Sequence, residues 1–300
     1  MTDGGLETTL IFHDGFDLPE FAAVDLLRSD EGTAALRSYY SRYAALATEF
    51  GLGFILESPT WRASPAWASR LGYSAAELDR LNRRAIELLE EIRDRFETAD
   101  APFVLSGCIG PQGDGYNPAE KLSALEAERY HATQIETFAE TSADMVTAIT
   151  MTYADEAVGI VRAATGSGLP AAISFTVETD GRLPSGQALG DAIDQVDGET
   201  EHTAAYFMIN CAHPTHFEDI LDPGAPWLQR VRGLRVNAST KSHAELDEAT
   251  ELDDGDPDDL ARRHTKLRAR LSSLNVVGGC CGTDHRHVAA ICRTLVNRPD

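Results

Sequence analysis

The chain has 300 residues, 43% of them hydrophobic and 25% charged, which excludes a disordered or fibrous protein and allows a large buried core. Its 26 basic and 48 acidic side chains give a formal net charge of −22 at pH 7, so nucleic-acid phosphate and anionic membranes are repelled overall. We therefore expect no nucleic-acid or membrane partner, and small molecules or proteins instead.

The opening, MTDGGLETTL, has no basic region followed by an apolar stretch, and no apolar run reaches the length of a membrane span. These features predict a soluble, cytoplasmic protein. The chain has five cysteines, an odd number, which argues against a disulfide framework. We expect reduced thiols that are buried, reactive or bound to a metal.

Short apolar runs alternate with longer amphipathic stretches along the whole chain. Each run is typical of a strand that is buried on both faces, as in a parallel sheet. The residues before Thr8 supply one further, short strand. The other runs cover residues 54–56, 103–105, 145–149, 171–175, 206–209, 234–236 and 276–277.

Helical patterns occupy the stretches between these strands, at residues 33–50, 74–97, 118–141, 154–165, 186–195, 257–271 and 284–296. In the clearest of them, Ser74 is the expected N-cap and Glu77 completes a capping box. A strand followed by a helix, repeated eight times, predicts an α/β fold of the (β/α)₈ TIM-barrel type. A doubly wound open sheet competes with it, but no G-x-G-x-x-G follows the first strand. Without a linker or repeat, we predict a single domain over residues 1–300.

The active site of such a barrel forms at the carboxyl ends of the strands, so the residues just after each apolar run are the candidates. These stretches are DGG at 3–5, ESPTW at 57–61, SGCIGPQGDGY at 106–116, TVETDG at 176–181, NCAHP at 210–214, NAST at 237–240 and GGCCG at 278–282. Four of the five cysteines lie in these stretches, and three of them lie at just two strand ends, after the sixth and eighth strands.

Cys211 follows the predicted sixth strand, and Cys280 and Cys281 follow the eighth. Three converging thiolates suit a tetrahedral Zn²⁺ whose fourth position stays open, as in catalytic sites. The two glycines before Cys280 let the backbone turn tightly towards the metal. From the spacing alone, two ordinary buried cysteines or a strained vicinal disulfide remain alternatives.

A zinc ion with three thiolate ligands is a weak Lewis acid, but it can bind a fourth thiol and lower the pKa of that thiol. The implied reaction is alkyl transfer to a substrate thiol. We interpret His213, two residues beyond Cys211, and His285 and His287 as surface or capping residues. A supporting contact of His213 to the metal site is the alternative.

Five stretches resemble, in order and spacing, the homocysteine S-methyltransferase family: DGGLETTL, LSGCIGPQGDGY, ISFTVETDGRLPSGQAL, INCAHP and VVGGCCGTDHRHVAAI. The resemblance spans essentially the whole chain. It implies a zinc-dependent (β/α)₈ barrel that moves a methyl group from an onium or folate donor to homocysteine, as in methionine biosynthesis. It also implies Zn²⁺ ligation by Cys211, Cys280 and Cys281.

By the same resemblance, Asp3, Gly4 and Ser58 match positions near the amino-acid end of homocysteine. The chain departs from the family at Ile149, where many members place a glutamate for the homocysteine ammonium, and Asp3 or Glu57 is the candidate replacement. Strand seven retains only Asn237 of the family's proline-asparagine turn. Homocysteine is the expected acceptor, with another small thiol as the alternative.

The expected donor is a sulfonium, S-methylmethionine or S-adenosylmethionine, with Trp61 or Trp67 as an aromatic face for it. Betaine-using relatives have an oligomerisation arm after the barrel, whereas this chain ends at Asp300. Those relatives also have a tyrosine at the position where SPTWRAS places Arg62, a cation that would repel betaine. Folate-dependent relatives carry further domains. The alternatives are a betaine-dependent enzyme, a zinc or thiol-ligand binding barrel without turnover and a zinc hydrolase; the oligomeric state stays open.

Overall fold

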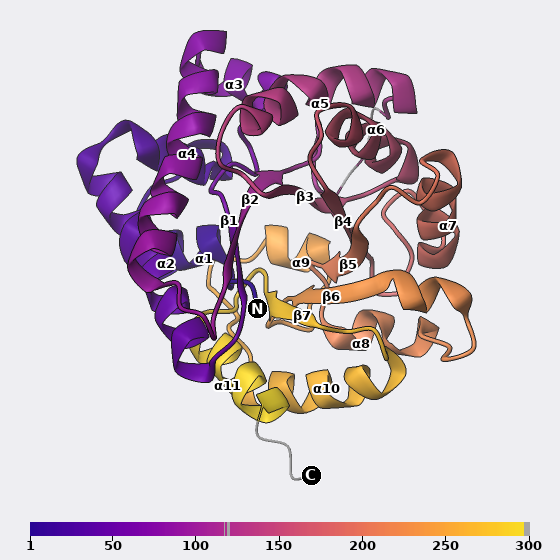
Figure 1. Ribbon diagram of the computed structural model, residues 1–300. Helices are drawn as coiled ribbons and strands as arrows, with labels where there is room; N and C mark the ends of the chain where they lie inside the picture. The colour runs from indigo at the N-terminus through magenta and orange to yellow at the C-terminus, as the bar shows by residue number, and fades with distance from the viewer. Residues whose placement is uncertain (117, 119–120, 297–300) are drawn as a thin grey trace.

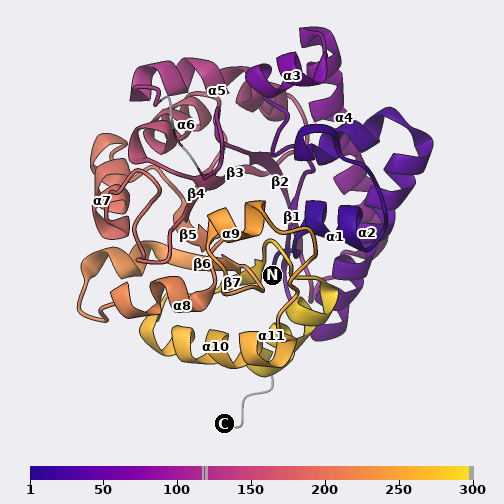
Figure 2. The ribbon, with the colours of Figure 1, turned by 180° about the vertical axis from the view of Figure 1, so that it is seen from behind.

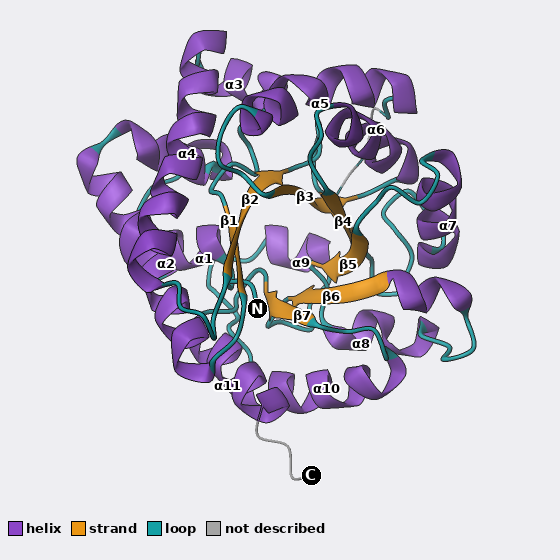
Figure 3. Cartoon of the chain, viewed as in Figure 1, coloured by secondary structure: helices purple, strands orange, loops and turns teal. Residues whose placement is uncertain are grey.

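Seven parallel strands form one sheet in which each strand pairs with the next along the chain. The computed structural model describes residues 1–116, 118 and 121–296. The sheet curls around the centre of the molecule and helices surround it (Figure 1 and Figure 3). The strands are β1 (Phe54–Glu57), β2 (Phe103–Ile109), β3 (Met145–Met151), β4 (Ala171–Thr176), β5 (Tyr206–Asn210), β6 (Val231–Val236) and β7 (Val276–Gly279). Each predicted run from residue 54 onwards lies within one of them.

The N-terminal segment, residues 1–3, takes the eighth position in the barrel. The amide of Thr2 donates to the carbonyl of Val277 at 2.9 Å, and the amide of Gly279 donates to the carbonyl of Asp3 at 2.8 Å. On its other side, the carbonyl of Met1 accepts from the amide of Ile55 at 2.9 Å. The segment therefore joins β7 to β1 through backbone hydrogen bonds without forming a strand of its own, and the predicted α/β barrel class is confirmed.

The long helices follow the predicted pattern: α2 (Asp30–Phe50), α4 (Ala75–Phe96), α5 (Ala124–Ala139), α6 (Ala154–Gly166), α7 (Leu189–Glu199), α10 (Pro257–Arg270) and α11 (His285–Val296). The sequence did not predict four short helices, because one or two turns carry too little periodicity. These are α1 (Leu6–Phe12), α3 (Pro65–Leu71), α8 (Pro214–Phe217) and α9 (His243–Asp247). Among the described residues, no helix is both long and apolar enough to cross a membrane.

The predicted cap of α4 is half correct. The hydroxyl of Ser74 accepts a hydrogen bond from the amide of Glu77 at 3.2 Å. The carboxylate of Glu77 does not complete a capping box with Ser74, because it lies 3.2 Å from the guanidinium of Arg28. A complete capping box begins α5 instead, between Ser123 and Glu126.

Gly278 and Gly279 have a different role from the one predicted. Both lie within β7, before the chain turns, so they do not form a turn towards a metal. A Cβ atom on Gly278 would lie 1.9 Å from the hydroxyl of Thr2, and one on Gly279 would lie 1.9 Å from the hydroxyl of Thr283. The two glycines therefore make room for the N-terminal segment and for the residues that follow β7.

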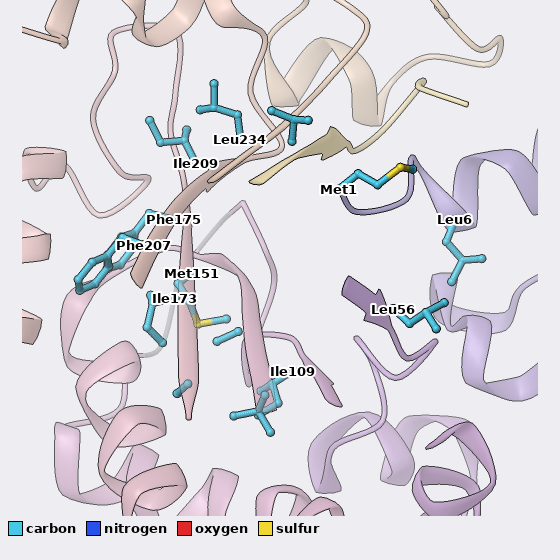
Figure 4. Close-up of a cluster of buried hydrophobic side chains, with 14 of the residues drawn as sticks. Met1, Leu6, Leu56, Ile109, Met151, Ile173, Phe175, Phe207, Ile209 and Leu234 are labelled. Carbon is cyan, nitrogen blue, oxygen red and sulfur yellow. The ribbon is translucent and has the colours of Figure 1, made fainter. Parts of the chain in front are cut away.

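The buried side chains of the strands and of the N-terminal region form one hydrophobic cluster, part of which Figure 4 shows. The rings of Phe175 on β4 and Phe207 on β5 are nearly parallel, with centroids 6.2 Å apart. The labelled members are Met1, Leu6, Leu56, Ile109, Met151, Ile173, Phe175, Phe207, Ile209 and Leu234. This core holds the strands in place, and their carboxyl ends carry the polar residues described below.

Substitution Gly278→Ala tests the packing of the N-terminal segment against β7. We expect the free energy of unfolding to fall by about 1–3 kcal/mol, as in other overpacked sites, because Thr2 must move. Urea denaturation measures it. Gly198→Ala is the matched control, since a Cβ atom there meets nothing within 4 Å and should cause no loss. Equal effects at both positions would contradict the close approach.

Candidate active site

Three cysteine sulfurs meet at the carboxyl ends of β5 and β7. The Sγ atom of Cys211 lies 2.6 Å from that of Cys280 and 4.0 Å from that of Cys281. All three sulfurs lie within 4.8 Å of one another, and all three residues are free cysteines. Because β7 ends at Gly279, the two adjacent thiols are released from the alternation of a strand and reach the same point.

The separations of the sulfurs suit a metal with little rearrangement. Tetrahedral ligands at a metal–sulfur distance of about 2.3 Å lie about 3.8 Å apart. The distance between Cys211 and Cys281 matches this value, and that between Cys211 and Cys280 needs to lengthen by about 1 Å. Within the described part of the chain, this is the one group of three or more His, Cys, Asp or Glu side chains with such spacing.

Hydrogen bonds between the thiols concentrate negative charge on Cys211. The thiols of Cys280 and Cys281 donate to its sulfur, which holds the pKa of Cys211 well below its ordinary value despite burial. The same bonds raise the pKa values of Cys280 and Cys281. The cluster thus stabilises one thiolate, the form in which cysteine binds metals.

Two hydroxyl groups, one from the loop after β2 and one from β3, lie near the sulfur of Cys211. The hydroxyl of Tyr116 lies 3.6 Å from it, and that of Thr150 lies 3.9 Å from it. The side chain of Asn210 fixes Thr150 by accepting from its amide at 3.0 Å and donating to its hydroxyl at 2.9 Å. Thr150 has φ 66° and Cys211 has φ 51°, a left-handed conformation that costs energy in a residue other than glycine.

A histidine from α9 supports the cysteine site. Nε2 of His243 lies 2.6 Å from the carbonyl oxygen of Cys211. Nδ1 of the same ring lies 3.1 Å from the carboxylate of Glu178. The same ring stacks on Tyr116 with centroids 4.2 Å apart. Figure 2 shows α9 in front of the ends of β5, β6 and β7. By contrast, His213 caps α8 through its bond with the amide of Thr215.

A pocket beside the sulfurs, which we call the inner pocket, contains most of the predicted substrate residues. Its lining includes the three cysteines, Asp3, Gly4, Glu57, Ser58, Trp61, Cys108, Tyr116, Ile149, Thr150 and Arg235. Gly4 approaches its neighbours closely, because a Cβ atom there would lie 2.6 Å from the hydroxyl of Tyr43. Asn237 does not line this pocket.

A buried ion pair forms one wall of the inner pocket. The guanidinium of Arg235, on β6, lies 2.5 Å from Oδ1 of Asp3, and Tyr39 donates to Oδ2 of Asp3 at 3.0 Å. A second nitrogen of Arg235 lies 3.9 Å from the carboxylate of Glu57. Arg235 is not among the site residues predicted from the sequence, although its place two residues before Asn237 on a barrel strand was the available signal.

Burial changes the acidity of the two carboxyl groups in this wall. Loss of hydration raises the pKa of Asp3, and the charge of Arg235 offsets only part of that rise. Burial also raises the pKa of Glu57 from 4.5 to about 7, again opposed by Arg235. Near neutral pH, Glu57 therefore lies close to the midpoint of its titration.

A second pocket, which we call the outer pocket, continues from the inner one towards solvent, and Trp61, Tyr116 and Cys281 line both. It combines aromatic rings with four carboxylates, from Asp114, Asp247, Glu251 and Asp253. Arg62 also lines it, with its guanidinium 4.9 Å from the centre of the Trp61 ring and 4.0 Å from that of Trp67. Trp67 is buried and lines neither pocket.

Comparison with known proteins gives one consistent result. A family model described as homocysteine S-methyltransferase matches residues 1–295. Proteins named homocysteine S-methyltransferase 1 from Arabidopsis thaliana and from Brassica oleracea var. italica are 24% and 25% identical to the chain, each over 99% of the chain and 94% of the relative.

Two crystal structures of the homocysteine methyltransferase MmuM from Escherichia coli share the fold of the chain. The oxidized form has a TM-score of 0.78 at 18% identity and covers 97% of this chain and 94% of its own. The metallated form has a TM-score of 0.76 at 18% identity and covers 97% of this chain and 95% of its own. These similarities support the barrel architecture described above.

Substitution Glu57→Gln tests the cost of the buried carboxylate. A pKa raised from 4.5 to about 7 by folding means that ionisation of Glu57 destabilises the fold, and this cost grows as pH rises through that range. We expect the variant to exceed the wild type in free energy of unfolding by up to about 3 kcal/mol at pH 8 and by much less at pH 5. Urea denaturation across this range measures the difference. Glu49→Gln, on the exposed side of α2, is the control and should show no such trend.

Proposed function

We propose that this chain moves a methyl group from a sulfonium donor to the thiol of homocysteine and forms methionine. The chain belongs to the homocysteine S-methyltransferase family, which supports this reaction. The protein is an enzyme of the methyltransferase class, EC 2.1.1. The observation that carries the proposal is the meeting of three cysteine sulfurs beside a pocket that also contains charged groups suited to an amino acid. We propose one domain over residues 1–300, small-molecule partners and a cytoplasmic location.

The residues that would hold Zn²⁺ are Cys211, Cys280 and Cys281. Their three soft sulfur donors suit zinc, and the stabilised thiolate of Cys211 gives the site the negative charge that the ion requires. Zinc bound there lowers the pKa of an acceptor thiol, so that the thiol binds as a nucleophilic thiolate. The hydroxyls of Tyr116 and Thr150 orient the sulfur of Cys211.

The proposed reaction forms one carbon–sulfur bond and breaks another. The acceptor sulfur bonds to the donor methyl carbon, the methyl–sulfur bond of the donor breaks, and the donor leaves as a neutral thioether. The proton of the acceptor thiol passes to solvent. The inner pocket holds the acceptor beside the cysteines, and the outer pocket brings the donor to Trp61 and Tyr116, which line both.

The charge of the outer pocket supports a sulfonium donor, either S-methylmethionine or S-adenosylmethionine. Both donors carry one net positive charge, whereas betaine is neutral overall and methylfolate is an anion. Four carboxylates line the outer pocket against the single guanidinium of Arg62, so the electrostatic balance favours a cation. The aromatic faces of Trp61 and Tyr116 favour it as well.

Single substitutions Cys211→Ser, Cys280→Ser and Cys281→Ser test the zinc site. Each substitution removes one sulfur ligand. We expect zinc affinity to fall by more than roughly 100-fold, because loss of a residue that only hydrogen-bonds to a ligand already costs up to that factor. Activity should fall with it. Competition with a chromophoric chelator measures the affinity. Cys292→Ala, which removes a thiol of α11 outside the triad, should keep one equivalent of zinc. A triple serine variant that is free of zinc and fully active would refute the proposed role of the metal.

A donor panel tests the proposed reaction. With zinc-loaded enzyme and homocysteine, we expect methionine from S-methylmethionine or S-adenosylmethionine, and much less from betaine or methylfolate. Asp247→Asn should raise the KM of the sulfonium donor roughly two- to fivefold, the effect of one exposed charge. Glu248→Gln is the matched control, because Glu248 is also exposed but does not line the outer pocket. Preference for betaine would overturn the sulfonium assignment.

A further inference from the structure

Two charged side chains of the inner pocket have polar atoms without a hydrogen-bond partner. Both carboxylate oxygens of Glu57 and the nitrogen Nη1 of Arg235 are buried and unpaired among the described residues. Glu57 is 4% exposed and Arg235 is 6% exposed, and both line the pocket that contains the cysteine sulfurs. Buried charged groups without partners are costly, so these atoms mark a position where a ligand supplies the partners.

The hydroxyls nearest to Glu57 do not satisfy its carboxylate. Ser106 and Thr147 lie close enough to lower its pKa slightly, but their hydroxyls bond to each other at 2.8 Å. Arg235 approaches Glu57 only to 3.9 Å, beyond hydrogen-bonding distance. The carboxylate of this pocket-lining residue therefore has its accepting capacity unused.

Of the other candidates for binding an ammonium group, Asp3 is already occupied and Ile149 is apolar, while Glu7 also lines the pocket but is less buried than Glu57. The two oxygens of Asp3 are held by Arg235 and Tyr39, at 2.5 and 3.0 Å. Ile149 presents an alkyl side chain, and its carbonyl oxygen accepts from the indole of Trp61 at 3.2 Å. Of Asp3, Ile149 and Glu57, only Glu57 offers buried carboxylate oxygens without a hydrogen-bond partner among the described residues.

We propose that Glu57 and Arg235 together bind the head group of an α-amino-acid thiol acceptor. The carboxylate of Glu57 accepts from the ammonium group, and Nη1 of Arg235 donates to the carboxylate group. An acceptor with only one of these charges would leave the other side chain unpaired, so the arrangement selects a zwitterion. This inference rests on the proposed function, because it assumes a thiol acceptor beside the cysteines.

Asp3 is a positioning residue in this arrangement. It binds Nη2 of Arg235, while Nε of Arg235 donates to the carbonyl of Gly279 at 3.2 Å. The guanidinium is therefore fixed on two sides, and Nη1 is left without a hydrogen-bond partner, 3.9 Å from Glu57. Asp3 then acts on the acceptor through Arg235.

Three thiols separate the two charge contacts. Homocysteine carries both charged groups, 4-mercaptobutanoate lacks the ammonium, and 3-aminopropane-1-thiol lacks the carboxylate. For Glu57→Gln, we expect KM to rise roughly 10- to 100-fold for homocysteine and for 3-aminopropane-1-thiol, with no change for 4-mercaptobutanoate, because one charged hydrogen bond is lost.

For Arg235→Lys, we expect the complementary pattern, with a higher KM for homocysteine and 4-mercaptobutanoate and no change for 3-aminopropane-1-thiol. Lysine keeps the positive charge beside Asp3 but lacks the second nitrogen of the guanidinium fork, so this variant retains the buried pair. Glu49→Gln should change none of the three KM values. If either site variant changes KM by the same factor for all three thiols, the role of that residue is structural and the proposal is wrong.

A binding measurement separates this proposal from the proposed reaction. Calorimetric titration of the metal-free protein with methionine and with 4-methylthiobutanoate measures how much the head group contributes to affinity. The two ligands differ only in the ammonium group, and neither turnover nor zinc is involved. We expect the wild type to bind methionine at least 10-fold more tightly than 4-methylthiobutanoate. The Glu57→Gln variant should bind the two ligands with equal affinity. Absence of methyl transfer with every donor would overturn the proposed function, whereas equal binding of the two ligands to the wild type would overturn the head-group assignment.

Discussion

The hydrogen bonds of residues 1–3 to β7 on one side and to β1 on the other are the constraint on which the site depends. They close the barrel, and they also bring Asp3 next to the end of β6, where it fixes Arg235. The same contacts leave no room for a side chain at Gly278. Closure of the barrel and the position of the charged wall thus share one cause.

The barrel was predictable from the sequence because its strands are short, mostly apolar runs and its long helices have clear periodicity. The N-terminal segment was weakly predicted, since residues 1–3 join the sheet through backbone hydrogen bonds and carry little apolar pattern. The short helix α9 was missed because five residues give no periodicity, and its part in the site was missed with it.

The three-cysteine cluster was predictable because cysteine is rare in this chain and the three residues follow predicted strands. Glu57 was predicted as a candidate, but the sequence could not show that its carboxylate oxygens lack hydrogen-bond partners. That property depends on how deeply the side chain is buried and on where its neighbours lie, and no sequence pattern records either. Arg235 was missed for a related reason. An arginine on a strand is usually exposed, and only the fold places this one against Asp3 inside the barrel.

Several features of the barrel mouth hold the chain in conformations or charge states that oppose folding. Thr150 and Cys211 have left-handed backbones, and Glu57 is a carboxylate without a partner. A barrel of this kind obtains its stability from the core and the outer helices, and the mouth is a local minimum of stability. Selection for thermostability alone would therefore find its easiest gains at the mouth, and those gains would come at the expense of turnover.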